Sequence, residues 1–98
     1  MAEKITAENL RTQKNEFVII DVREADELES GKIEDSTHMP LGLAIRNAKK
    51  KQIEDLRGKK ICTYCGTGYR GNIAADELVK EGFDAVTLEG GYPSWKQE

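Results

Sequence analysis

A thiol, two glycines and a guanidinium occur within the six residues Cys65-Gly66-Thr67-Gly68-Tyr69-Arg70. Glycine accepts positive φ without steric cost, so this loop can curl tightly and aim several backbone N–H groups at one point. The helix expected after the loop adds the positive end of its dipole, and Arg70 adds a full charge. These groups would stabilise the thiolate of Cys65, the nucleophilic form of cysteine, and the same N–H groups would hold an incoming anion.

Spacing alone leaves three chemistries open for this thiol: sulfur transfer, phosphoester hydrolysis and dithiol redox exchange. The redox hypothesis rests on Cys62, which forms a C-x-x-C pattern with Cys65. We place Cys62 inside a strand over residues 60–64, where three extended residues separate the two Cα atoms by about 10 Å. A disulfide needs less than about 7 Å, and odd spacing along a strand directs the side chains to opposite faces. Cys62 is therefore predicted to be a buried spectator, with a resolving thiol reached by loop movement as the alternative.

The elements that must position this loop are predicted from hydrophobic spacing and turn residues. Strands are predicted at residues 17–20, 36–39, 60–64 and 85–88, and helices at 6–15, 24–30, 43–57, 71–81 and around Trp95. The run at 17–20 is apolar on both faces, which is typical of a strand inside a parallel sheet. Alternating strands and helices predict an α/β fold, with a mainly parallel central sheet flanked by helices on both faces. In such a sheet, ligands bind beyond the carboxyl ends of the strands, where Cys65 falls.

Length and charge restrict the classes of protein further. Ninety-eight residues predict one domain over residues 1–98, and a chain of this size buries roughly 65% of its unfolded surface. The net charge of −3 argues against nucleic acid as a partner. The longest apolar run, residues 17–20, is far shorter than a membrane span or the core of a signal peptide. We therefore expect no membrane partner and a cytoplasmic location, where thiols stay reduced.

Four motifs, in order, resemble those of a single-domain rhodanese, the thiosulfate sulfurtransferase-like family. They are Ile19-Ile20-Asp21-Val22-Arg23-Glu24 with Glu27 downstream, then Gly31, Ile33, His38, Met39 and Pro40, then the loop at 65–70, then Leu88 to Trp95. The sequence departs from the family pattern at Lys32, at Asp35-Ser36 and at Leu28, which are scaffold positions. It also has Gly66 where thiosulfate-using members often carry Arg, so a sulfonate-binding charge is missing from the loop.

The resemblance implies a mechanism in two halves. The Cys65 thiolate attacks the outer sulfur of a sulfane donor, and sulfite or a thiol leaves; the Cys65 persulfide then passes its sulfur to cyanide, a small thiol or a partner protein's cysteine. This is covalent catalysis with ping-pong kinetics, and it requires no metal or organic cofactor. Cys65 is the predicted catalytic residue, and the active loop of Gly66, Thr67, Gly68, Tyr69 and Arg70 is the predicted substrate-binding segment.

The remaining candidates have two interpretations each. Arg70 either orients the anionic end of the donor or pairs with an acidic neighbour and holds the loop closed. Asp21 and Arg23 end a strand at the same edge and are predicted to be supporting residues. A structural ion pair or cap is the preferred interpretation, and a substrate contact is the alternative. His38, the only histidine, is predicted to be structural.

Two other functions stay open. A Cys-dependent phosphatase or arsenate reductase uses the same thiolate chemistry, but its loop resembles C-x5-R, and here the Arg follows Cys65 by five residues instead of six. The other alternative is a sulfur-relay protein that carries persulfide sulfur between proteins with little turnover of small molecules.

Overall fold

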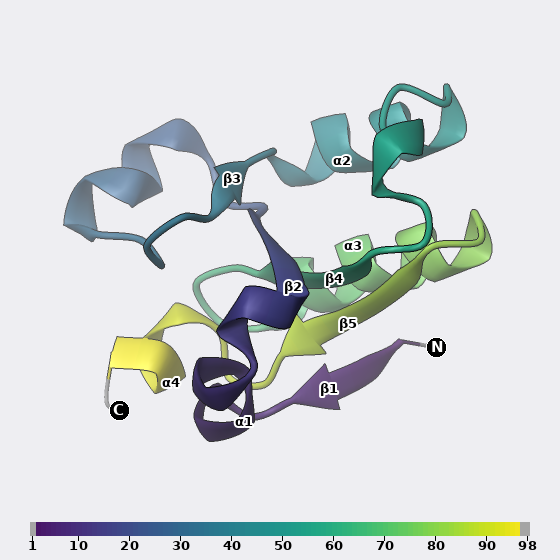
Figure 1. Ribbon diagram of the computed structural model, residues 1–98. Coiled ribbons are helices and arrows are strands. Elements are labelled where there is room, and N and C mark those ends of the chain that lie inside the picture. Colours follow the sequence, from purple (N-terminus) through teal and green to yellow (C-terminus); the bar gives the residue numbers. More distant parts are fainter. Residues whose placement is uncertain (1, 97–98) are drawn as a thin grey trace.

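The computed structural model describes residues 2–96, which form one five-stranded sheet with helices packed on it (Figure 1). The α-helices and strands are β1 (Glu3–Ile5), α1 (Ala7–Thr12), β2 (Phe17–Asp21), β3 (Thr37–His38), α2 (Leu41–Lys49), β4 (Lys60–Tyr64), α3 (Tyr69–Lys80), β5 (Asp84–Leu88) and α4 (Tyr92–Lys96). Three short 3-10 helices are η1 (Lys14–Glu16), η2 (Ala25–Ser30) and η3 (Glu54–Leu56). Within residues 2–96, no helix is long and apolar enough to cross a membrane.

The sheet has the order β1-β5-β4-β2-β3, and every neighbouring pair is parallel. The predicted parallel α/β fold is therefore confirmed. Strand β4 lies at the centre, and after Lys60 all of its residues are buried. Because all five strands run the same way, their carboxyl ends meet at one edge, and the loop that follows β4 begins there.

Helices cover both faces of the sheet, as predicted. One apolar cluster holds residues of α2 and α3, and a second holds residues of α1 together with apolar side chains of α4 packed against it. In Figure 1, α1 (dark purple) and α4 (yellow) lie close together, and α2 lies apart from them. Cys65 belongs to the first cluster and Cys62 to the second.

Several predicted boundaries are wrong, each for a local reason. Strand β1 is missed because it is three residues long and has one apolar side chain. The helix predicted over 6–15 does begin after Thr6, whose side chain caps it, but it ends at Thr12. The helix predicted over 43–57 stops at Lys49, because Lys51 adopts φ +59°.

Three further expectations change at the other helices. The segment predicted as a helix over 24–30 is the 3-10 helix η2, which a reciprocal capping box between Glu24 and Glu27 begins. Helix α3 starts at Tyr69 instead of residue 71, because Gly68 with φ +101° is its N-cap. Val79, which helical spacing groups on one face with Ala74, Ala75 and Leu78, is 39% exposed.

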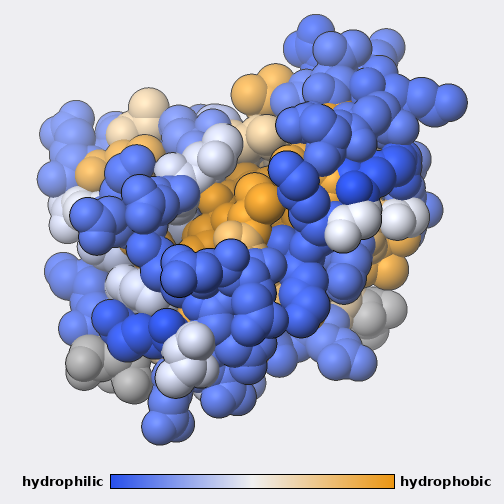
Figure 2. All heavy atoms as spheres, viewed as in Figure 1, coloured by the Kyte–Doolittle hydropathy of each residue, from blue (hydrophilic) through white to orange (hydrophobic). Residues whose placement is uncertain are grey.

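Charged residues make up 34% of the composition, and apart from buried ones such as Asp21 and Arg23 they lie mainly at the surface. Figure 2 shows a largely hydrophilic face with apolar atoms visible in a hollow near its centre. On the side of β2 and β3, Val18, Ile20, Met39, Ile53 and Leu56 are among the residues that line a small cavity of about 190 Å³. These side chains belong to, or pack against, the apolar cluster that also holds residues of α2 and α3.

The close packing of α3 on the sheet depends on Gly71. A Cβ atom there would lie 2.8 Å from Thr87 Oγ1 and 3.2 Å from Tyr64 Cα. We predict that Gly71→Ala lowers the free energy of unfolding by about 1–3 kcal/mol through overpacking. Gly42, in the exposed first turn of α2, has nothing within 4 Å of such an atom. Gly42→Ala is the matched control and should raise stability by about 0.5–1 kcal/mol. Urea denaturation of both variants measures the difference, and equal losses would contradict this account of Gly71.

Candidate active site

Cys65 follows the last residue of β4 directly and lies four residues before α3. Its side chain is buried, and its sulfur accepts a hydrogen bond of 3.1 Å from the backbone N–H of Gly68. Gly68 adopts φ +101°, a conformation that favours glycine, and this turn brings its N–H back toward the sulfur. The predicted curled loop is therefore present in the structure.

Two opposing effects set the pKa of Cys65. Burial raises the pKa of this thiol, but hydrogen bonds from the backbone N–H groups of Gly71, Thr67, Gly68 and Arg70 outweigh burial and lower it below the ordinary value of 9.0. These donors come from the loop and the first turn of α3, where N–H groups lack helical partners. The site can therefore hold negative charge on sulfur at the bottom of a backbone nest.

A turn from the C-terminal segment closes the other side of the loop. Tyr92 N donates to the carbonyl of Cys65 at 2.8 Å. Gly91 adopts φ +71°, and a Cβ there would lie 2.5 Å from that carbonyl oxygen and 2.9 Å from Gly68 N. Sequence reasoning assigned no role in the site to Gly91 or Tyr92. The adjacent glycines 90–91 signal a turn, but nothing local indicates that this turn packs on the loop.

Arg70 is bound to Glu27 of η2 by two parallel hydrogen bonds, each 2.7 Å long, between the guanidinium and the carboxylate. The side-chain bonds from Arg70 lower the pKa of Glu27 to about 2, and they raise the pKa of Arg70. Of the two interpretations of Arg70, this geometry matches the pairing that holds the loop closed. The sequence analysis did not identify Glu27 as the acidic partner of Arg70.

Asp21 and Arg23 form a buried ion pair next to the loop. Arg23 Nη2 lies 2.7 Å from Asp21 Oδ2, and the two side chains are 3% and 0% exposed. Burial raises the pKa of Asp21, but the hydrogen bonds from Arg23 and Tyr64 outweigh it, so the pKa lies below its usual value. The geometry matches a structural pair more closely than a substrate contact.

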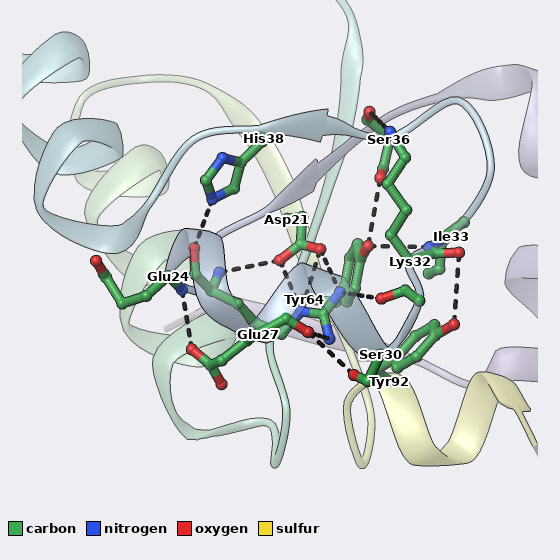
Figure 3. A network of polar contacts seen from close by, with 12 residues as sticks. Asp21, Glu24, Glu27, Ser30, Lys32, Ile33, Ser36, His38, Tyr64 and Tyr92 are labelled. Atoms are coloured by element: carbon green, nitrogen blue, oxygen red, sulfur yellow. Dashed lines mark hydrogen bonds and ion pairs between the residues drawn. The ribbon is translucent and has the colours of Figure 1, made fainter.

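The surroundings of this pair form a continuous polar network (Figure 3). Arg23 also donates to the carbonyls of Glu27 at 3.3 Å and Gly31 at 2.8 Å. Its guanidinium carbon lies 5.5 Å from the ring centroid of Tyr64 and 4.7 Å from that of Tyr92. The network thus joins the ends of β2 and β4 to η2 and to α4.

The other predicted residues occupy distinct places. Tyr69 is 73% exposed, and Thr67 Oγ1 accepts from Tyr69 N at 3.4 Å. His38 makes a hydrogen bond of 2.7 Å between Nε2 and the carbonyl of Arg23, which fits the structural role predicted for it. Within the described residues, no group of three or more His, Cys, Asp or Glu side chains is arranged to hold a metal ion.

Cys62 lies within β4, as predicted, and its thiol is buried in the apolar cluster opposite the one that contains Cys65. Burial raises the pKa of this thiol to about 12, so it stays protonated at neutral pH. Both cysteines are free thiols. A protonated thiol on the far face of the sheet is poorly placed to form a disulfide with Cys65.

Two cavities flank the loop. One of about 470 Å³ is lined by Arg23, Glu27, Ser30, Gly66, Tyr92, Pro93 and Lys96. The other, of about 280 Å³, is lined by Thr67, Gly68, Tyr69, Asn72 and residues of β1 and β5 with the turn after β5. We call the first the Gly66 cavity, because Gly66 is the loop residue that borders it.

The fold and the site together are a parallel α/β sheet that carries a cysteine loop at its carboxyl edge, between the central strand and a helix. Residues 5–98 match the model of the Rhodanese-like domain, and the chain belongs to this family. The resemblance inferred from the four sequence motifs is thus confirmed.

Individual relatives agree with the family assignment. The chain is 32% identical over 85 residues to the thiosulfate sulfurtransferase GlpE of Coxiella burnetii, an alignment that covers 86% of this chain and 76% of that protein. It is 30% identical over 98 residues to the putative sulfurtransferase YtwF of Bacillus subtilis, covering 100% and 85% of the two chains. The crystal structure of a rhodanese-related protein from Thermoplasma volcanium superposes with a TM-score of 0.83 at 32% identity, covering 97% and 91%.

The lowered pKa of Cys65 can be measured in Cys62→Ala, which leaves one thiol. We predict that the ultraviolet absorbance of the thiolate titrates with a midpoint below 9.0, the ordinary value. Since folding lowers this pKa, the stabilisation is complete above the unfolded pKa and is lost as the pH falls through the folded pKa. In Cys65→Ser, by contrast, the remaining thiol should titrate only near 12 or on unfolding. A midpoint at or above 9.0 in Cys62→Ala would contradict the nest.

The Arg70–Glu27 pair can be tested with a double-mutant cycle. Glu27→Gln and Arg70→Lys each remove the paired fork, so the double variant should be less destabilised than the sum, with a coupling of about 0.5–1 kcal/mol for this partly exposed pair. Because the folded pKa of Glu27 is about 2 against an ordinary 4.5, its stabilisation is complete above pH 4.5 and fades as the pH falls toward 2. Additive losses in thermal denaturation would show that the two side chains act independently.

Proposed function

We propose that this protein is a sulfurtransferase that moves a sulfane sulfur from a donor to a thiophilic acceptor through a persulfide on Cys65. The observation that carries the proposal is the backbone nest around the Cys65 sulfur, which lowers the pKa of the thiol although the side chain is buried. Membership of the Rhodanese-like family and the sulfurtransferase names of the relatives support it.

The reaction has two halves. In the first, the Cys65 thiolate attacks the outer sulfur of the donor, a bond forms between Sγ and that sulfur, and the donor's S–S bond breaks. The leaving group, sulfite from thiosulfate or a thiolate from an organic persulfide, departs with the electron pair. In the second half, cyanide, a small thiol or a protein cysteine attacks the outer sulfur and releases the Cys65 thiolate.

The loop residues serve this chemistry in different ways. The N–H groups of Thr67 and Gly68, with those of the first turn of α3, stabilise the thiolate and then the persulfide anion. Gly66 borders the cavity of about 470 Å³ beside the loop, and the side chain of Tyr69 is exposed at the rim of the loop. Arg70 is a positioning residue through its pair with Glu27, as are Asp21 and Arg23 through the network below the loop.

Phosphoester hydrolysis is supported less well. The loop is one residue shorter than the C-x5-R pattern, and the guanidinium of Arg70 is occupied by a carboxylate that an incoming phosphate would have to displace. A sulfur-relay protein is the second candidate, because Gly66 supplies no charge for a small inorganic donor. Either sulfur-transfer function needs a reduced Cys65, and we propose the cytoplasm as its compartment.

Mass spectrometry tests the central claim. After incubation with thiosulfate or an organic persulfide, the peptide containing Cys65 should gain one sulfur atom, and Cys65→Ser should gain none. The matched control is Cys62→Ala, which should keep most of the transfer to cyanide because this thiol lies on the other face of the sheet. Sulfur uptake by Cys65→Ser, or faster turnover of an aryl phosphate than of every sulfane donor, would refute the proposal.

The enzyme and the relay protein are separated by a second comparison. A free-standing enzyme should turn over a small donor with cyanide faster than it accepts sulfur from a cysteine desulfurase. A relay protein should show the reverse order. Both outcomes require Cys65, so Cys65→Ser is the blank in each assay.

A further inference from the structure

The Gly66 cavity opens beside the residue that follows Cys65, and its volume of about 470 Å³ is that of a small-molecule site. A Cβ atom on Gly66 would meet nothing closer than Glu27 Oε2 at 3.6 Å, and its φ is not in the glycine-specific region. Packing therefore does not require a glycine here. Gly66 lines the cavity and follows the buried Cys65 directly, so the cavity borders the loop at the residue next to the thiol.

Two of the three charged residues that line this cavity form ion pairs. The guanidinium of Arg23 is bound by Asp21, and the carboxylate of Glu27 is bound by Arg70. Lys96 is the third charged residue of the lining, and within residues 2–96 no carboxylate lies within ion-pair distance of its ammonium. Because the other two charges are paired, Lys96 supplies the positive charge of the lining among residues 2–96.

Helix α4, which carries Lys96, is anchored at both of its ends. Arg11 Nη2 donates to the carbonyl of Trp95 at 2.7 Å, and its guanidinium carbon lies 3.9 Å from the Trp95 ring centroid. At the other end of the helix, Tyr92 N donates to the carbonyl of Cys65. The ammonium of Lys96 lies 5.8 Å from the ring centroid of Tyr92, so it faces the same wall of the cavity.

The walls of the cavity indicate the class of donor. Tyr92 and Pro93 provide carbon surface between the loop and Lys96, and the single ammonium suits one anionic group at a distance from the reacting sulfur. Thiosulfate has no carbon to place against these side chains. A small organic persulfide with a carboxylate has a sulfane sulfur, a carbon skeleton and one anion in that order.

We propose that Lys96 is a specificity-determining residue that binds the carboxylate of a low-molecular-weight organic persulfide, whose terminal sulfur then reaches Cys65 past Gly66. This assignment rests on the sulfurtransferase function proposed above and names its donor. In the transfer, the Cys65 thiolate attacks the terminal sulfur of R–S–SH, and the new S–S bond forms as the donor's S–S bond breaks. The thiolate R–S⁻ leaves with the electron pair, and the proton stays on the transferred sulfur.

The test compares two donors in single-turnover loading of Cys65, followed by mass spectrometry. Cysteine persulfide carries a carboxylate, and hydroxyethyl persulfide does not. Lys96→Gln should raise the half-saturating concentration of cysteine persulfide about three- to fivefold, as expected for a surface charge pair, and leave the saturating rate unchanged. It should not change loading by hydroxyethyl persulfide, and Lys96→Arg should restore the wild-type value.

The matched control is Lys59→Gln, because Lys59 is an exposed lysine just before β4, at the sheet edge away from the loop. It should load like the wild type with both donors. Normal loading of Lys96→Gln by cysteine persulfide, or an equal loss with both donors, overturns the role of Lys96 but leaves the proposed function standing. Failure of every donor to load Cys65 in the wild type overturns both.

Discussion

The buried ion pair of Asp21 and Arg23 joins four separate segments of the chain at the edge of the sheet where the thiol lies. Desolvating two charges costs several kcal/mol per ion, and only good geometry with further hydrogen bonds offsets that cost. Arg23 meets this condition with bonds to Asp21 and to two carbonyls of the η2 region, while Tyr64 and Tyr92 cover it. Within the part of the chain that the structure describes, no buried side-chain polar atom lacks a partner.

The ion pair of Asp21 and Arg23 supports the backbone nest around Cys65 indirectly, through residues that contact both. Arg23 holds the carbonyl of Glu27, and the carboxylate of Glu27 holds Arg70 in the first turn of α3. From the other side, Tyr92 covers Arg23 and binds the carbonyl of Cys65. The curvature that directs four N–H groups at the sulfur is thus maintained from η2 and from α4, which are far apart in sequence. The conformation of this glycine-containing loop is supported from two sides, and both supports, η2 and α4, contact the guanidinium of Arg23.

Sequence reasoning recovered the features that local chemistry determines. The apolar strands at 17–20, 60–64 and 85–88 and the loop at 65–70 were placed within a residue or two, because dense β-branched runs and glycines act over short distances. Strand β1 was missed because pairing with β5 stabilises it, not its own composition. The partner of Arg70 and the contact of Gly91 with the loop were also missed, since both join segments more than 20 residues apart. Such contacts leave no periodic trace in one sequence.

The placement of Cys62 has a consequence for oxidative damage. When peroxide converts a thiolate to a sulfenic acid, a second thiol in reach can condense with it and halt further oxidation. Here the chain has two cysteines, and the second is protonated and buried against the opposite face of the sheet. A sulfenic acid on Cys65 therefore has no resolving partner within its own chain, and its rescue must come from an external thiol. The separation that disfavours a disulfide between Cys62 and Cys65 also leaves an oxidised Cys65 dependent on external thiols.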